Sequence, residues 1–328
     1  MEAVMVVVMD ILKSVKQVIH ISKVLSVGMY TIRIIGCCET EEGYELPDSA
    51  TGFLEKLPND KNKWDLVYIL NPQEQVVLQA SSAIPVAGYE DGPMPYRIFQ
   101  ESSGNYLWLR MNKDKSSCLE YRISGNWNVW ELLYDSTLSS SSNYFEELAY
   151  IFPYSILNKG GIMFHGVVME WKSMGIIICA HSGVGKTTHT RMWRDQEGAL
   201  ILNGDRALCC REETTWYTYG SPWNGSSGEC INRKAGLKAI VLLEQAENNQ
   251  ILHLSRLQGA KELIPLAFAP AWEPELLNHA LDSIDEITCG IPVFKLRCRP
   301  EEEAVSILKQ ELEKLRYEKL QSEGGLRQ

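Results

Sequence analysis

Apolar positions along the first part of the chain come in short runs, and several of these runs alternate with polar residues, as residues 106–111 (YLWLRM) do in part. Turn-forming pairs and triplets such as Asn71-Pro72 and Ser124-Gly125-Asn126 separate the runs. The close, hairpin-like spacing favours antiparallel pairing, so a small antiparallel sheet domain is expected. The predicted strands cover residues 30–36, 65–70, 75–80, 95–100, 105–111, 117–123 and 127–134.

The pattern changes after the serine-rich residues 136–142 (STLSSSS), which are typical of a linker or a helix start. A helix is predicted over 143–157, with Pro153 as a kink. Strands and helices then alternate, which is typical of an α/β domain. The predicted strands are 162–169, 175–179, 199–203, 206–210, 237–243 and 292–298, and the predicted helices are 186–194, 258–267, 274–288 and 300–318.

The N-terminal residues are predicted to lie outside the folded core. Residues 1–9 are apolar but too short to span a bilayer, and they lack a basic leader and a cleavage site. An amphipathic helix is predicted over 10–27, and Met29, directly before the first predicted strand, is a natural start. The expected organisation is an extension over 1–28, a β-rich domain over 29–140, an α/β domain over 141–318 and a tail over 319–328.

Charge and cysteine content narrow the classes of function. The 328 residues carry a formal net charge of -10 without a long basic run, so neither a nucleic acid nor an anionic membrane is an expected partner. Nine cysteines without a CxxC spacing argue against a zinc site and favour reduced thiols in a cytoplasmic protein. Three tryptophans of the β-rich part are expected in its core rather than on a binding face: Trp108, Trp127 and Trp130.

The strongest chemical signal is the segment Ala180-His181-Ser182-Gly183-Val184-Gly185-Lys186-Thr187. It matches the Walker A phosphate loop G-x-x-x-x-G-K-[ST], with Ala180 in place of the first glycine. Its glycines let backbone N–H groups point at phosphate oxygens, Lys186 supplies a positive charge, and Thr187 offers a hydroxyl to Mg²⁺. The residues from Ser182 to Thr188 are therefore the predicted ATP-binding residues. An apolar strand before the loop and a helix after it are the context that such a loop requires.

An acidic partner for the loop is expected at the end of a neighbouring strand. Asp205 follows the apolar residues 199–202 and is the candidate for holding Mg²⁺ or activating the acceptor. The alternative interpretation is an Asn203-Gly204-Asp205 hairpin turn, and both descriptions are compatible. His165 lies in an apolar strand, where the residues alone favour a structural role.

These motifs together resemble the catalytic domain of HPr kinase/phosphorylase, and phosphoenolpyruvate carboxykinases share a related loop. The similarity rests on residues 164–170 (FHGVVME), residues 175–178 (GIII) and the loop at 182–187, followed by residues 200–206 (LILNGDR). It covers about residues 160–300 of the chain. It implies an α/β fold in which a P-loop kinase domain with a mixed sheet follows a smaller β-rich domain.

The resemblance also implies residue roles. Lys186 and Thr187 would bind ATP phosphates and Mg²⁺, Asp205 would match the second residue of the family's Asp-Asp pair, and His165 would match its active-site histidine. Gly204 stands where the family has the first aspartate, which is taken as its general base. The family's C-terminal phosphorylase signature is not apparent. Asp205 alone, or Asp205 with His165, is left to activate the acceptor.

Residues 220–229 (GSPWNGSSGE) depart from HPr kinase proper and resemble a divergent branch of related kinases. Some members of that branch tailor ribosomally made peptides, such as lasso-peptide precursors, on a serine. The segment itself reads either as a solvated loop or as a flexible loop over the acceptor.

Three functions follow as hypotheses. The first is an ATP-dependent kinase acting on a serine of a peptide or protein, with Lys186, Asp205 and His165 as its catalytic residues. The second is a small-molecule kinase or carboxykinase-like enzyme, and the third is an ATP-binding sensor or scaffold with little turnover. The oligomeric state stays open, with a homo-oligomer among the options.

Overall fold

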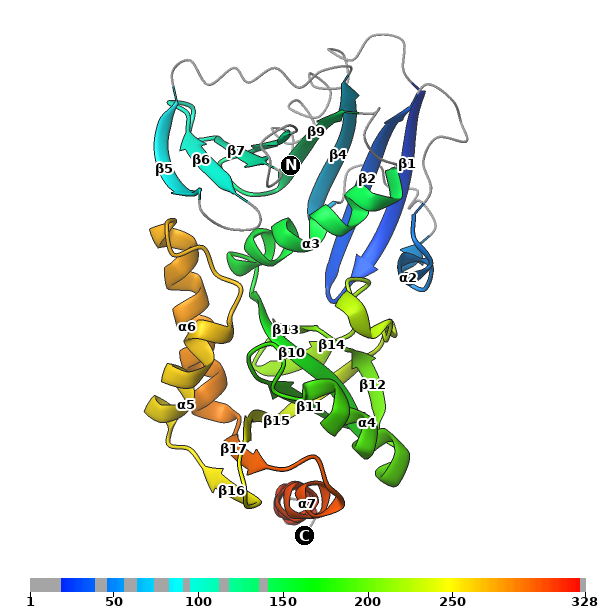
Figure 1. The fold of residues 1–328 in the computed structure, drawn as a ribbon, viewed down its shortest axis with the longest axis vertical. Coiled ribbons are helices and arrows are strands. Elements are labelled where there is room, and N and C mark those ends of the chain that lie inside the picture. The colour runs from blue at the N-terminus through cyan, green and yellow to red at the C-terminus, as the bar shows by residue number, and fades with distance from the viewer. Residues whose placement is uncertain are drawn as a thin grey trace. The chain divides into compact units, whose positions relative to one another are not determined.

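The computed structural model describes residues 19–38, 46–55, 64–73, 83–90, 95–111, 118–135 and 141–324. The chain divides into two compact units, Met1–Ser155 and Ile156–Gln328, and each is described by itself (Figure 1). The division falls near the end of helix α3 (Ser141–Leu157), most of which belongs to the first unit and which contains Pro153. The strand predicted over 75–80 and most of the serine-rich linker lie outside the described residues.

The first unit contains one mixed sheet, in which nine strands of the described part follow the order β3-β1-β2-β4-β9-β8-β7-β6-β5. A short helix, α2 (Asp48–Thr51), precedes β3. The strands are β1 (Ile19–Val27), β2 (Tyr30–Cys38), β3 (Leu54–Glu55), β4 (Leu66–Gln73), β5 (Ile84–Tyr89), β6 (Tyr96–Gln100), β7 (Tyr106–Met111), β8 (Cys118–Ile123) and β9 (Val129–Asp135).

The prediction of a purely antiparallel sheet is wrong at its centre, where β4 runs parallel to both β2 and β9. The antiparallel run β5–β9 agrees with the short spacing of its strands. By contrast, β4 is joined to β2 and β9 through longer stretches of chain. Such connections allow the parallel pairs that hairpin spacing cannot reveal.

The helix predicted over 10–27 is wrong for residues 19–27, which form strand β1, and residues 10–18 lie outside the described part. Strand β1 pairs along its whole length with β2, and Val27 lies opposite Tyr30. Gly28 adopts a φ of 65° in the two-residue turn between them. Because hairpins of this length favour positive φ at their turn residues, Gly28 is the signal that identifies this pairing.

The core of the first unit is aromatic. Trp108, Trp127 and Trp130 are all buried, which confirms their expected place in the core. Tyr154 of α3 stacks on Trp108 with a centroid distance of 6.1 Å and meets Trp127 edge-on at the same distance. The apolar face of α3 therefore closes one side of the sheet.

The second unit is built on another mixed sheet, with the order β11-β10-β13-β14-β15-β17-β16 and β12 paired with β10. Strand β11 also pairs with β15, so β10, β11, β13, β14 and β15 form a closed ring. The pairs β11–β15 and β15–β17 are parallel, and the other pairs are antiparallel. The strands are β10 (Gly161–Trp171), β11 (Met174–Cys179), β12 (Leu200–Asn203), β13 (Arg206–Glu212), β14 (Thr215–Tyr219), β15 (Lys234–Gln245), β16 (Gln250–His253) and β17 (Val293–Cys298).

Helices pack against this sheet, and Figure 1 shows α5 and α6 side by side. Trp193 of α4 meets Trp171 of β10 edge-on at 5.2 Å, in a cluster that also contains Leu308 and Leu312 of α7. The helix predicted over 258–267 is shorter, because η3, which contains Pro265, replaces its last turn. The helices are α4 (Lys186–Glu197), α5 (Arg256–Leu263), α6 (Pro274–Gly290) and α7 (Glu302–Gly324), with 3₁₀ turns η2 (Gly225–Ser227) and η3 (Ile264–Leu266).

The fold is therefore a mixed α/β arrangement with two mixed sheets, of which the sequence predicted only the one in the second unit as mixed. Across the described ranges, none of the helices is both long enough and apolar enough to cross a bilayer.

Candidate active site

The predicted phosphate loop connects the end of β11 to the start of α4. Gly183 and Gly185 adopt φ values of 82° and 111°, a conformation that glycine enters without the strain of a Cβ atom. A Cβ atom built at either glycine would meet nothing within 4 Å, so the backbone conformation, not crowding, requires glycine here. The turn places the N-terminus of α4, with its unpaired N–H groups, at the loop, where an anion binds favourably.

Lys186 is buried, and its ammonium group lies across the loop. Its Nζ donates to the carbonyl oxygens of Ala180 at 2.8 Å and His181 at 3.3 Å, and it lies 2.9 Å from Nε2 of His165. Burial lowers the pKa of Lys186, and the negative charge of Asp205 acts in the opposite direction. The ammonium is thus held at the loop by neutral acceptors that a phosphate group can replace.

His165, on β10, connects Lys186 to Asp205. Because an ammonium group only donates, Nε2 of His165 accepts from Lys186, and its proton is assigned to Nδ1. Nδ1 lies 3.5 Å from Oδ1 of Asp205. Burial, followed by the charge of Lys186, lowers the pKa of His165, while Asp205 opposes that shift. The three predicted catalytic residues are therefore neighbours in the structure.

The position of Asp205 depends on Asn203, a residue that the sequence identified only as part of a turn. Oδ1 of Asn203 accepts from the backbone N–H groups of Asp205 at 2.9 Å and Arg206 at 2.7 Å. Its Nδ2 donates to Ser221 and to the carbonyl oxygen of Trp223. Fully buried Asn203 therefore joins the Asp205 turn to the segment that follows β14.

That segment lies against the turn through η2. A Cβ atom at Gly204 would overlap the side chain of Ser227, so η2 leaves no room for a side chain at this position. A Cβ atom at Gly225 would lie 2.8 Å from Cγ of Asp205. Glycine at 204, where the resemblance implies an aspartate, thus has a physical cause in the close approach of η2.

The loop, the turn and η2 enclose a cavity of about 260 Å³. Its lining contains the three predicted catalytic residues, His165, Lys186 and Asp205. It also contains both predicted metal ligands, because Asp205 is one of them and Thr187 is the other. The lining residues are His165, Ser182, Gly183, Gly185, Lys186, Thr187, Gly204, Asp205, Ser226 and Ser227.

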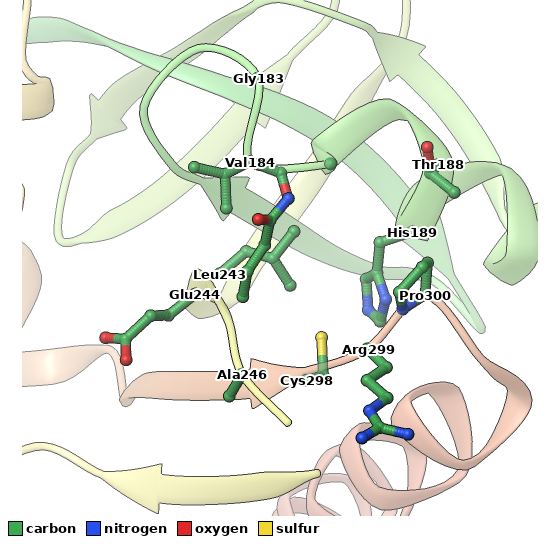
Figure 2. Close-up of a pocket in the computed structure, with 12 residues that line it drawn as sticks. Gly183, Val184, Thr188, His189, Leu243, Glu244, Ala246, Cys298, Arg299 and Pro300 are labelled. Carbon is green, nitrogen blue, oxygen red and sulfur yellow. The ribbon is translucent and has the colours of Figure 1, made fainter. Parts of the chain in front are cut away.

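A larger cavity of about 470 Å³ shares Gly183 and Gly185 with the smaller one (Figure 2). It lies where the parallel strands β15 and β17 end. Of its lining residues, the sequence analysis had identified only those of the loop and Thr188. Gln245 fixes the loop here by donating from Nε2 to the carbonyl oxygen of Val184 at 3.1 Å. The lining residues are Gly183, Val184, Gly185, Thr188, His189, Leu243, Glu244, Gln245, Ala246, Cys298, Arg299 and Pro300.

His189 contributes a neutral side chain to this larger cavity. Its Nε2 lies 3.2 Å from the indole Nε1 of Trp193, which can only donate, so the His189 proton is assigned to Nδ1. Burial lowers the pKa of His189 to about 4. The side chain is thus neutral near pH 7, and the larger cavity is lined by apolar, neutral polar and charged groups around the phosphate loop.

Thr187 and Asp205 present a hydroxyl and a carboxylate oxygen to the same small cavity. Oxygen ligands of this kind, completed by phosphate oxygens and water, suit Mg²⁺, so the residues present fit the expected metal. Among the described residues no group of three or more His, Cys, Asp or Glu side chains forms a metal cluster of its own. A metal here would therefore depend on the nucleotide for most of its ligands.

Known proteins give limited further information. No family model matches the chain, and no curated protein matches it. Among solved structures, the HPr(Ser) kinase/phosphatase from Coxiella burnetii matches with 9% identity over 51% of this chain and 98% of that one. The TM-score of this match is 0.32, and the function is argued below from the site itself.

Proposed function

We propose that this protein is an ATP-dependent kinase that transfers the γ-phosphoryl group to a hydroxyl, with a serine of a peptide or protein as the acceptor. One observation carries the proposal: the phosphate loop with Lys186 shares a cavity of about 260 Å³ with Asp205 and His165. Phosphoryl transfer needs little beyond positioning and charge stabilisation, and this cavity holds groups for both.

Each of the two cavities is proposed to bind a different part of the nucleotide. The larger one accommodates the nucleoside, and the smaller one accommodates the terminal phosphates, with the loop glycines lining both. On binding, Lys186 exchanges the carbonyl oxygens of Ala180 and His181 for phosphate oxygens. Thr187 and Asp205 would hold Mg²⁺, which neutralises charge on the phosphates when it is bound.

Asp205 is the proposed acceptor-activating base, because its carboxylate lies at the cavity wall and Gly204 offers no second carboxylate. His165 keeps Lys186 in place through Nε2, and its Nδ1 lies 3.5 Å from the Asp205 carboxylate. In protein kinases an aspartate accepts the proton of the acceptor hydroxyl, and the same role is proposed for Asp205. The role of His165 is therefore positioning rather than direct proton transfer.

The acceptor approaches along η2, which borders the small cavity. The segment 220–229 is proposed to contact the acceptor chain, in keeping with a kinase that tailors a ribosomal peptide precursor. A second candidate function, an ATP-binding regulator with little turnover, is favoured by the packing of η2 over Gly204 and Asp205. Binding of ATP without transfer to any serine peptide would favour that regulator.

The test measures transfer from labelled ATP to a set of serine-containing peptides. Lys186→Ala is expected to lower the transfer rate by about 10²–10³-fold, the usual cost of removing a group that stabilises transition-state charge. Lys314→Ala is the matched control, since Lys314 is exposed on α7 and is expected to leave the rate unchanged. Transfer at the wild-type rate by the Lys186 variant would refute the assigned site.

A further inference from the structure

Two adjacent serines of η2, Ser226 and Ser227, line the small cavity, and their hydroxyls differ in their hydrogen bonding. The Ser227 hydroxyl donates to the carbonyl oxygen of Asn224 at 2.7 Å and accepts from the N–H of Glu229 at 3.1 Å. Ser226 is exposed, and within the described part of the chain its hydroxyl has no hydrogen-bond partner. Ser226 is therefore the serine whose oxygen is free to react.

Ser226 lines the same cavity as the proposed base, and the residue before it lies against that base. It follows Gly225 directly, and a Cβ atom at Gly225 would lie 2.9 Å from Oδ2 of Asp205. The cavity that Ser226 lines also contains Lys186 and Thr187, which are proposed to bind the terminal phosphates. A phosphoryl donor, a base and a free serine hydroxyl are thus brought to one cavity by a single chain, which raises their effective concentration.

The backbone of η2 can adjust to bring the hydroxyl into line. Gly225 and Gly228 flank the two serines with φ values of 56° and 72°, and a Cβ atom at Gly228 would meet nothing within 4 Å. A short 3₁₀ turn between two glycines opposes small rotations less than a regular helix would.

We propose that Ser226 is a site of intramolecular autophosphorylation, an inference that rests on the proposed kinase function. The Ser226 oxygen forms a bond to the γ-phosphorus of ATP while the bond between that phosphorus and the β,γ-bridging oxygen breaks. ADP leaves with the bonding electron pair. The serine proton passes to Asp205 and then to solvent, so the step requires only ATP as co-reactant.

The modification would regulate the same site. A phosphoserine carries a charge of about -1.5 to -2 near neutral pH and three acceptor oxygens. Placed at residue 226, it would pair with Lys186 and occupy the space of the terminal phosphate. Transfer to other acceptors is then expected to slow once Ser226 is modified.

The experiment incubates the full chain with labelled ATP in the absence of any other acceptor and locates the label by mass spectrometry. We expect one phosphate per chain, on Ser226, at a fractional rate that does not change with protein concentration. Ser226→Ala is expected to remove the label, and Ser226→Thr to move it to phosphothreonine. Ser306→Ala, an exposed serine on α7, is the matched control and is expected to keep full labelling.

Each other result contradicts the inference in a recognisable way. Unlabelled wild-type protein that still phosphorylates a serine peptide overturns the self-acceptor and leaves the kinase function intact. Label that persists in the Ser226→Ala variant, or a rate that rises with protein concentration, overturns the intramolecular step at this residue. Protein that binds ATP and labels neither itself nor any peptide overturns both proposals.

Discussion

Asn203 is fully buried at the end of β12, and both ends of its amide are in use. One end accepts from the N–H groups of Asp205 and Arg206, and the other donates to Ser221 and Trp223. A buried amide with all of its bonds satisfied fixes a single geometry, because any rearrangement leaves a polar group without a partner. The placement of the Asp205 carboxylate depends on this residue.

Replacing Asn203 with alanine is expected to destabilise the second unit and to lower phosphoryl transfer. The change leaves two partly buried N–H groups without their acceptor, at a cost of at most about 1–3 kcal/mol for each unsatisfied group. Urea unfolding followed by tryptophan fluorescence measures the loss. Asn203→Asp keeps the acceptor oxygen but turns a charged oxygen toward the carbonyl oxygens of Ser221 and Trp223, so it should lose at least as much stability as the alanine variant. Equal stability of the alanine variant and the wild type would disprove the assignment.

Glu131 is a buried carboxylate of the first unit, and its burial disfavours the charged form. It accepts from Nδ2 of Asn71 at 2.7 Å, and its other oxygen is 3.8 Å from Arg122. Burial raises the pKa of Glu131, and the bond from Asn71 and the charge of Arg122 only partly oppose that shift. The native chain therefore keeps the Glu131 proton to a higher pH than the unfolded chain.

Glu131→Gln is expected to raise the free energy of unfolding at neutral pH. The stabilisation that protonated Glu131 provides is present below its unfolded pKa and is lost as the pH rises through the raised native value. Glutamine carries no charge and still accepts from Asn71, so this loss disappears. Denaturant unfolding across acidic and neutral pH should show a smaller fall in stability for the variant. The two curves would stay parallel if Glu131 were not the titrating group.

At the scale of elements, the packing of η2 against the turn between β12 and β13 limits which side chains the candidate site can contain. The strands and helices of the second unit follow from their apolar runs, and the predicted boundaries of β10, β11 and α4 differ from the observed ones by a few residues. Strands β14 and β16 were not predicted, because they are short and lack a clear apolar alternation. The contact between Gly204 and η2 joins residues about twenty positions apart, and local sequence patterns do not report such contacts.

Gly204→Asp is expected to damage the site even though it restores the residue that the family resemblance implies at that position. Its Cβ atom would overlap Ser227, so η2 must move away from the cavity. We expect a lower transition temperature and a lower transfer rate than in the wild type. The double variant Gly204→Asp with Ser227→Gly should recover stability, because the overlapping side chain is gone. A Gly204 variant that is faster than the wild type would contradict this account.

At the scale of the whole molecule, each residue placed in the site belongs to the second unit, between His165 and Pro300. The sheet of that unit is closed by the β11–β15 pair and covered by its own helices. It contains a core cluster that includes Trp171, Trp193 and residues of α7. A unit with its own core and its own site meets the conditions for independent folding.

Residues 156–328 produced alone are therefore expected to bind ATP with an affinity within about threefold of the full chain, a difference of roughly 0.7 kcal/mol. Isothermal titration with ATP and Mg²⁺ measures the affinity of both proteins. The Lys186→Ala variant of the shorter protein is the control and should bind weakly. Loss of ATP binding in a shorter protein that is folded by circular dichroism would show that the first unit contributes to the site.

The sequence by itself predicted the phosphate loop, because glycine conformation, a lysine and a helix start are local properties that a short motif specifies. It also indicated His165 and Asp205, although their roles came from a resemblance to a family. Only the tertiary structure decided that His165, Lys186 and Asp205 are neighbours and that Asn203 holds the turn. It also decided that η2 fills the space beside Gly204. These features depend on strand register and on close packing between distant segments, which are fixed when the chain folds as a whole.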